Sequence, residues 1–277
     1  MKWATFRLGD RIRGGRLFED HVIPKRAPEP FDLASWLERL HALEELPDAE
    51  PVPLTDVNLL PPIPAPRKII CVGANFEPHR VEMGRPKPSH PMLFTRFAST
   101  LVGQDGALVR PRESAQLDYE GELAVVIGRT ARRVDPADAW SVVAGVSVFN
   151  DATIRDWQRH TTQFTPGKNF DRTAGFGPCL VTTDALPDVA SWRIETRVNG
   201  DLRQEGSLDE LTFPIPRIIA YASAFTTLGP GDVIATGTPS GVGASFEPPH
   251  FLEPGDLVEV SISGVGQLRN TVTDERS

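Results

Sequence analysis

Two glutamates, Glu120 and Glu122, are the residues of this sequence that most directly suggest chemistry. They lie in the segment Asp-Tyr-Glu-Gly-Glu-Leu-Ala-Val-Val-Ile-Gly, which is typical of a strand that enters a core. Because side chains of a strand alternate between its two faces, both carboxylates point the same way, and Gly121 leaves the opposite face bare. A buried carboxylate pair is costly unless a cation neutralises it, and hard divalent cations prefer carboxylate oxygen. The pair is therefore either a metal site or a strand end whose two acids lie in water.

A third acid, Asp151, ends the apolar segment Val-Val-Ala-Gly-Val-Ser-Val-Phe-Asn-Asp and precedes a segment that we expect to be helical. Aspartate is a common N-cap, so one role for Asp151 is to cap that helix. The other is to give a third oxygen ligand to the pair Glu120 and Glu122. Three carboxylates completed by water suit an octahedral Mg²⁺ or Mn²⁺ ion.

Several other chemistries lack their motifs in this sequence. The glycine-rich segment 235–243 has no Gly-Lys-Ser/Thr ending of a phosphate loop, and Ser240 lacks the flanking glycines of a nucleophile elbow. There is no His-Glu-x-x-His and no Cys-x-x-Cys, which argues against zinc chemistry. Cys71 and Cys179 are far apart, which indicates buried thiols rather than a disulfide framework.

The composition predicts a cytoplasmic globular protein. The 277 residues carry 37 acidic and 29 basic side chains, a net charge of −8, with no basic cluster that would favour nucleic acid or an anionic membrane. No segment is long and apolar enough to span a bilayer, and the first residues do not resemble a signal peptide.

Strand-like segments with few intervening helices predict an α+β fold, a β-rich and mostly antiparallel mixed sheet. We predict a small N-terminal α+β domain with a proline-rich linker over residues 1–66, and a catalytic domain over residues 67–277. The linker is the segment 47–66, which we expect to be extended. Apolar periodicity predicts helices over residues 31–46, 153–163 and 215–225.

Six segments, in the same order, resemble the fumarylacetoacetate hydrolase family. The first is Gly-Ala-Asn-Phe-Glu-Pro-His-Arg-Val-Glu-Met-Gly, and the set covers residues 73–84, 118–128, 150–158, 167–171, 198–204 and 231–243. The resemblance extends from about Lys68 to the end of the chain. It implies the family's β-rich roll or sandwich, a homodimer, and Mg²⁺ or Mn²⁺ bound by Glu120, Glu122 and Asp151.

The resemblance also implies three catalytic residues. His79 and Glu82 are three residues apart and so share one helical turn; in isolation such a pair is usually a solvated surface pair. In the family this pair lies on a lid, where Glu82 orients His79 as the base that activates water. Lys168 is either a solvated lysine or, as the resemblance implies, a cation that stabilises developing negative charge.

Three further residues are implied to bind substrate. Arg155 and Gln158 share a helix face, which is either a polar outer face or a contact to substrate oxygens. Thr238 lies in the glycine-rich segment, where the backbone can approach a ligand closely. Two positions depart from the family pattern: Phe76 replaces a tyrosine, and Arg96 stands where lysine is common.

The sequence therefore predicts a divalent-metal-dependent hydrolase that cleaves a carbon–carbon bond in a β-diketo acid such as an acylpyruvate. An oxaloacetate-type decarboxylase or an enol–keto isomerase with the same site is the alternative. A non-catalytic metal- or ligand-binding protein is a third possibility, against which the implied base His79 argues. The expected partner is a small keto acid.

Overall fold

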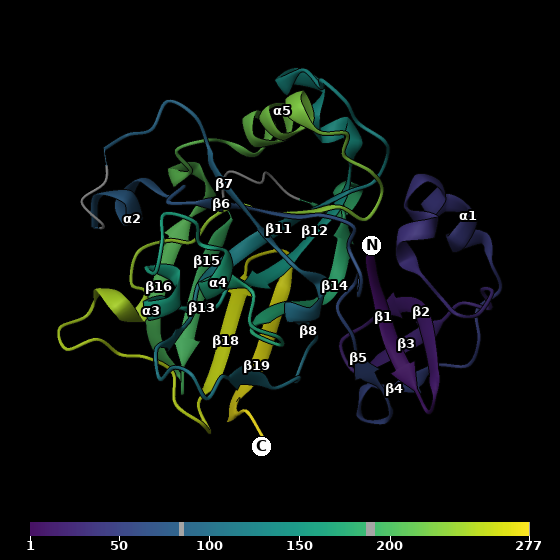
Figure 1. Ribbon diagram of the computed structural model, residues 1–277. Coiled ribbons are helices and arrows are strands. Elements are labelled where there is room, and N and C mark those ends of the chain that lie inside the picture. Colours follow the sequence, from purple (N-terminus) through teal and green to yellow (C-terminus); the bar gives the residue numbers. More distant parts are fainter. Residues whose placement is uncertain (83–85, 187–191, 277) are drawn as a thin grey trace.

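A twelve-stranded mixed sheet organises the computed structural model, which describes residues 1–82, 86–186 and 192–276 (Figure 1). Its strands are β1 (Lys2–Leu8), β2 (Arg11–Leu17), β3 (His21–Pro24), β4 (Val52–Pro53), β5 (Asn58–Leu59), β6 (Ile69–Gly73), β7 (Met92–Arg96), β8 (Leu101–Val102), β11 (Gly121–Ile127), β12 (Val143–Asn150), β14 (Ala174–Thr182) and β17 (Val233–Ala235). The order is β4-β3-β2-β1-β14-β12-β11-β17-β6-β7, with β5 paired to β1 and β8 to β14. Only the pairs β17–β6 and β14–β8 of this described sheet are parallel.

A second sheet of five strands packs against the first. It has the order β16-β15-β18-β19-β9 and consists of β9 (Leu108–Arg110), β15 (Arg193–Val198), β16 (Asp201–Ser207), β18 (Leu257–Ile262) and β19 (Gly266–Asp274). A short pair joins β10 (Leu117–Asp118) to β13 (Thr153–Ile154). The helices are α1 (Leu40–Glu45), α2 (Glu77–Glu82), α3 (Arg155–Gln158), α4 (Thr165–Lys168) and α5 (Ile215–Phe225). The α+β, β-rich fold predicted from the sequence is confirmed.

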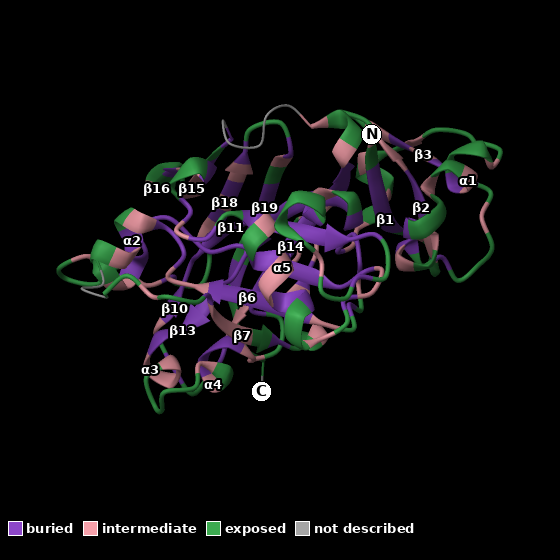
Figure 2. Cartoon of the chain, turned by 90° about the horizontal axis from the view of Figure 1, so that it is seen from above, coloured by how far each residue is buried: buried purple, intermediate pink, exposed green. Residues whose placement is uncertain are grey.

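Strand β11 is buried on both faces, and its alternation sets the direction of the acids. Leu123 and Val125 pack in the cluster that contains Val260 of the second sheet, whereas Ala124 and Val126 pack in the cluster on the other face. Every residue of β11 and β12 is buried, and Figure 2 shows buried residues in purple through the centre of the molecule, where β11 lies. Full burial of one such aliphatic side chain contributes about 1.5–3 kcal/mol.

Gly121 permits the two sheets to approach each other. A Cβ atom at this position would lie 2.2 Å from Oγ1 of Thr196 in β15 and 3.0 Å from Cγ1 of Val260 in β18. The face of β11 that the sequence predicts to be bare is therefore the face covered by the second sheet. Glu122 points to the opposite face.

The N-terminal segment is joined to the main sheet by β1, which pairs with β14 (Figure 1). Trp3, Phe31 and Leu33 share a hydrophobic cluster with Phe149 and Phe176 of the main sheet. The proline-rich segment is only partly extended: a 3₁₀ helix, Leu54–Asp56, interrupts it, and two of its short stretches, β4 and β5, pair with β3 and β1. The division into two domains at residue 66 stays a prediction.

Two predicted helices differ from the structure. Residues 31–46 contain a 3₁₀ helix, Leu33–Arg39, followed by the short α1, and residues 153–163 contain only the four-residue α3. Thr153 and Ile154 pair with β10 instead, and Thr161 bonds through its hydroxyl to the backbone of Gln163. Pairing and such local bonds compete with a helix. The predicted helix 215–225 is confirmed as α5.

Two smaller predictions concern membranes and cysteines. Within the described residues, no helix has the length and apolar character needed to cross a membrane. Cys71 and Cys179 are buried, as predicted.

Candidate metal centre and active-site pocket

The paired ends of β11 and β12 bring three acids together. Gly121 pairs with Asn150, and the N–H of Asp151 donates to the carbonyl of Glu120 at 2.8 Å. Carboxylate oxygens of Glu120, Glu122 and Asp151 all lie within 4.8 Å of one another, and all three residues are buried. The interpretation of a strand end in water is therefore wrong. Helix α3 has Ile154 as its N-cap, so Asp151 is not a helix cap either.

Three buried cations compensate two of these acids. The Nζ atom of Lys168 lies 2.6 Å from Oε2 of Glu120 and 2.6 Å from Oδ2 of Asp151. Arg155 contacts the other oxygen of Glu120 at 2.7 Å, and Arg96 bonds the other oxygen of Asp151. Burial disfavours the charge on Glu120, but Lys168 and Arg155 outweigh it and lower the pKa of Glu120 to about 2.

Glu122 is the acid that forms no ion pair with a cation among the described residues. Its carboxylate accepts a hydrogen bond of 2.8 Å from the N–H of Gly237. Burial and the charges of Asp151 and Glu120 raise the pKa of Glu122 well above its usual range. The cluster thus offers the carboxylate oxygens of three buried acids, one of which, Glu122, forms no ion pair among the described residues, and this donor set fits a hard divalent ion such as Mg²⁺ or Mn²⁺.

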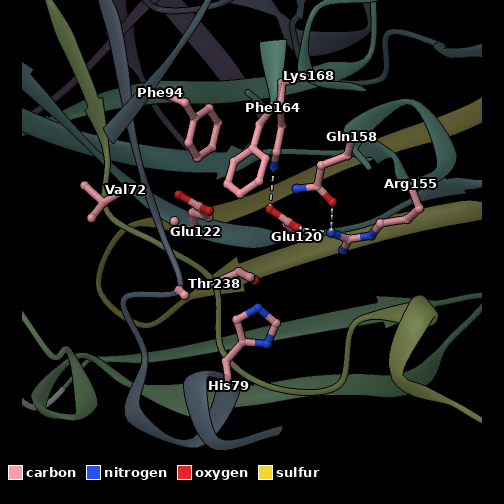
Figure 3. Close-up of a pocket in the computed structure, with 12 residues that line it drawn as sticks. Val72, His79, Phe94, Glu120, Glu122, Arg155, Gln158, Phe164, Lys168 and Thr238 are labelled. Atoms are coloured by element: carbon pink, nitrogen blue, oxygen red, sulfur yellow. Dashed lines mark hydrogen bonds and ion pairs between the residues drawn. The ribbon is translucent and has the colours of Figure 1, made fainter. Parts of the chain in front are cut away.

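A cavity of about 30 Å³ lies beside the acids (Figure 3). Seven of the nine predicted site residues line it: His79, Glu120, Glu122, Arg155, Gln158, Lys168 and Thr238. Val72, Phe94 and Phe164 form an apolar wall. The structure therefore brings together residues that span 160 positions of the chain, from His79 to Thr238, with Asp151 buried within the acidic cluster and Glu82 in contact with His79.

On α2, His79 is buried and is paired with Glu82, whose side chain is 27% exposed. The Nδ1 atom of His79 lies 3.0 Å from Oε2 of Glu82, and the His79 side chain is 4% exposed. The other Glu82 oxygen accepts from the N–H of Gly241 at 3.2 Å. With Nδ1 engaged by Glu82, Nε2 is the nitrogen left for the pocket, and Figure 3 shows His79 facing the acids from the side opposite Lys168. Residues 83 and 84 of this sequence motif lie outside the described residues.

Hydrogen bonds to Glu82 favour its ionised form. Burial opposes the charge, but the hydrogen bonds from His79 and from the Gly241 N–H lower the pKa of Glu82. Glu82 is thus an anionic partner for the imidazole of His79, as the sequence predicts.

Arg155 offers an unused donor beside the pocket. Its Nε donates to Asp118 at 2.7 Å, and one amino group donates to Gln158 at 3.2 Å and contacts Glu120. The other amino group is buried and has no hydrogen-bond partner among the described residues. A buried donor without a partner is costly, so an oxygen of a bound anion is a partner that would satisfy Arg155.

Thr238 has a structural contact that the sequence does not reveal. Its hydroxyl donates to the carbonyl of Gly121 at 2.9 Å and accepts from Gln204 at 2.8 Å. These bonds fix the glycine-rich loop beside β11, where Gly237 has a φ of +106° that favours glycine. The predicted contact of Thr238 with substrate stays a prediction.

Two residues contribute more than sequence reasoning assigned to them. Asp118 is fully buried and accepts from Arg155 and from the N–H groups of Gly243 and Ala244, which ties α3 to the glycine-rich loop. Its spacing of two and four residues from the glutamates is a period-two pattern that could have identified it. Arg96 donates hydrogen bonds both to the carboxylate of Asp151 and to the carbonyl of Ala152, so it fixes the orientation of the Asp151 side chain.

Phe76, the other departure from the family pattern, is fully buried in the hydrophobic core rather than exposed in the pocket. Its ring packs close to Gly206, where a Cβ atom would lie 3.2 Å from Cε1. Phe76 is not among the residues that line the described pocket.

Comparison with known proteins identifies a family. The model "Fumarylacetoacetate (FAA) hydrolase C-terminal" matches residues 68–273. A curated relative, "Oxaloacetate tautomerase YisK" of Bacillus subtilis, is 46% identical over 224 residues, which are 79% of this chain and 74% of the relative.

Two solved structures have the same fold. A fumarylacetoacetate hydrolase (EaFAH) from Exiguobacterium antarcticum superposes with a TM-score of 0.87 at 40% identity, covering 99% of this chain and 100% of that one. A maleylpyruvate hydrolase from Sphingobium sp. SYK-6, in complex with manganese(II) and pyruvate, has a TM-score of 0.82 at 30% identity and full coverage of both chains.

Proposed function

The chain belongs to the fumarylacetoacetate hydrolase family, and on that premise we propose that it is an oxaloacetate tautomerase that uses Mg²⁺ or Mn²⁺. Its 46% identity with a relative of that name supports the reaction, and the manganese of the maleylpyruvate hydrolase structure supports the metal. The observation that carries the proposal is the pocket itself, where an uncompensated buried acid, Glu122, lies beside an unpartnered Arg155 amino group. Such a site suits a cation together with a small oxyacid.

Glu120, Glu122 and Asp151 would hold the metal ion through their oxygens. The bound ion supplies Lewis-acid polarisation to an α-keto acid, whose keto and carboxylate oxygens are hard ligands. Arg155 would bind a substrate carboxylate oxygen through its free amino group. Lys168, held within 2.6 Å of Glu120 and Asp151, fixes both side chains and adds positive charge where negative charge develops on the keto oxygen.

His79 is the group placed to move the proton. Tautomerisation from the keto to the enol form removes a proton from the carbon next to the keto group and places one on the keto oxygen. Nε2 of His79 can accept the carbon proton, Glu82 stabilises the imidazolium that results, and the imidazolium can return the proton to the keto oxygen, which completes the enol and restores neutral His79. The apolar wall of Phe94 and Phe164 excludes water from this step.

Carbon–carbon hydrolysis of an acylpyruvate, the first expectation from the sequence, is the second candidate. The pairing of buried His79 with Glu82 favours it, because hydrolysis needs a base that activates water. The 30% identical maleylpyruvate hydrolase also supports it. Decarboxylation of oxaloacetate remains the third, since it needs only the metal as an electron sink.

A panel of reactions tests the proposal. The protein is loaded with Mg²⁺ or Mn²⁺ and given oxaloacetate, with tautomerisation and pyruvate formation followed separately, and then a set of acylpyruvates. We expect tautomerisation well above the spontaneous rate, with a kcat/KM above that of the other two reactions. Acylpyruvate cleavage faster than tautomerisation would replace the proposal with the hydrolase.

A further inference from the structure

The cavity beside the acids is too small for a whole four-carbon keto acid. Its volume of about 30 Å³ accommodates a few atoms, since one water requires at least about 10–15 Å³ by this measure. A groove of about 580 Å³ adjoins it, and the two share Arg155, Gln158 and Phe164 as lining residues. The end of a substrate that does not face the acids must therefore extend past these residues into the groove.

Arg159 lines that groove and belongs to the same helical turn as the inner residues. Arg159 is the C-cap of α3 and keeps a helical backbone conformation, so positions 155, 158 and 159 are related as i, i+3 and i+4 and their side chains lie on one side of this turn. The spacing of four residues corresponds to about 6 Å along the helix axis. Arg155 thus lies at the inner end of the path that a substrate would follow, and Arg159 lies at the outer end.

Arg159 is a cation of the groove that can bind an anionic group of a substrate. It is exposed and has no ion pair within residues 1–82, 86–186 and 192–276, whereas Arg155 is committed to Asp118 and Glu120. The hydroxyls of Thr161 and Ser245, which also line the groove, bond to backbone groups. Glu82 is an acidic residue that lines the groove, and its carboxylate is hydrogen-bonded to His79 and to the N–H of Gly241.

We propose that Arg159 binds the distal carboxylate of the substrate and selects keto diacids over keto acids that carry a single charge. The inference rests on the proposed function, because an α-keto acid whose keto end faces Glu120, Glu122 and Asp151 directs its other end along α3. Arg159 takes no part in the proton transfer. It is a specificity-determining residue, and a fork of guanidinium donors matches a carboxylate.

The test compares oxaloacetate with its C4 methyl ester, which lacks the distal charge. For Arg159→Met we expect kcat/KM for oxaloacetate to fall about three- to tenfold, through KM, with the ester unaffected. Arg159→Lys should recover part of the discrimination. The control is Arg193→Met, an exposed arginine of β15 outside the groove, which should leave both substrates unchanged.

Binding separates this inference from the proposed function. Calorimetric titration of the Mn²⁺-loaded protein with oxaloacetate and with oxalate, which has no distal arm, reports affinity whether or not turnover occurs. Weaker oxaloacetate binding and unchanged oxalate binding in Arg159→Met support the inference even if no tautomerisation is detected. Two results would contradict the inference. In the first, Arg159→Met binds and converts oxaloacetate as the wild type does. In the second, its affinity for oxalate and its kcat/KM for the ester fall as much as the values for oxaloacetate, so that Arg159 does not recognise the distal charge.

Discussion

Glu120, Glu122 and Asp151 are all buried, yet the charges that surround them differ. Lys168 and Arg155 neutralise Glu120, Lys168 and Arg96 neutralise Asp151, and Glu122 has only a backbone N–H. A divalent ion would therefore neutralise mainly the charge of Glu122. The cations that are paired with the other two acids would lie at the edge of the metal site. With a divalent ion held by the three acids, these cations would leave the site with a net positive charge, which a keto diacid needs.

His79 gives the first prediction at this scale. For His79→Ala we expect a fall of about 10²–10⁴ in the kcat of tautomerisation, the usual value of a positioned base, with unchanged affinity for Mn²⁺. The kcat of Glu82→Gln should fall less than that of His79→Ala, because this substitution removes the charge but keeps a hydrogen-bond acceptor for Nδ1 of His79. Steady-state kinetics and metal titration of both variants test this, and a His79→Ala rate within a few-fold of wild type would assign the base elsewhere.

Lys168 gives the second. Removal of one partner from a buried ion pair costs about 3–5 kcal/mol, because the remaining charge is left uncompensated. Lys168→Met should therefore lower the Tm of the metal-free protein strongly, and Mn²⁺ should raise the Tm of this variant more than that of the wild type. Thermal unfolding with and without Mn²⁺ measures both shifts. A metal-free variant as stable as wild type would contradict the buried ion pairs of Lys168 described above.

At the scale of elements, the site depends on strand ends and on close approaches at glycine. β11 and β12 set the acids, α2 carries His79, and α3 and α4 carry Arg155 and Lys168. Helix α4 can reach the acids because Gly167 lets it touch α3. A Cβ atom there would lie 2.3 Å from the backbone nitrogen of Gln158 and 2.6 Å from the carbonyl oxygen of Ile154.

Gly167→Ala tests the role of this contact. Because backbone must move, we expect a loss of about 1–3 kcal/mol in stability and a lower kcat, as Lys168 and Gln158 shift. Gly229→Ala is the matched control, since its added Cβ would meet only a carboxylate oxygen of Asp232 at 4.0 Å. Denaturant unfolding and kinetics of the two variants are compared. Equal effects of both substitutions would mean that the α3–α4 contact does not position the site.

At the scale of the whole molecule, the residues before and after position 66 share one hydrophobic cluster. One of the two end strands of the large sheet, β7, has one edge without a partner strand among the described residues, and Phe97 directly after it is 55% exposed. Open edges and exposed aromatic side chains are features that proteins commonly cover by association. These features agree with the homodimer that the family resemblance implies.

We therefore propose a homodimer in solution. Static light scattering at micromolar concentration should give twice the mass of the chain. Phe97→Asp should shift the distribution toward the monomer if the edge of β7 lies in the interface, whereas Phe18→Asp, at a 41% exposed phenylalanine of the N-terminal segment, should not. A wild-type protein with the mass of a single chain would refute the homodimer.

Local patterns predicted the acids, while contacts between distant residues could not be predicted from them. The period of two placed Glu120 and Glu122 on one face, and apolar spacing identified α5. The burial of Lys168 against Glu120, 48 residues away, follows from the path of α4. Thr153 and Ile154 form a strand because β10 is available to pair with them, which overrides their helical pattern. The sequence showed that Arg96 departs from the family pattern, but it could not predict the contact of Arg96 with Asp151.

The most direct test of the account is the rate of oxaloacetate tautomerisation as a function of bound metal in wild type and in Glu122→Gln. We predict that the wild type, freed of metal by chelation, falls to the spontaneous rate and recovers with Mn²⁺ or Mg²⁺. Glu122→Gln should need more than about 100-fold more metal or remain inactive, whereas Glu113→Gln, at an exposed glutamate, should behave as wild type. Undiminished tautomerisation by wild-type protein shown to be free of metal would contradict the account.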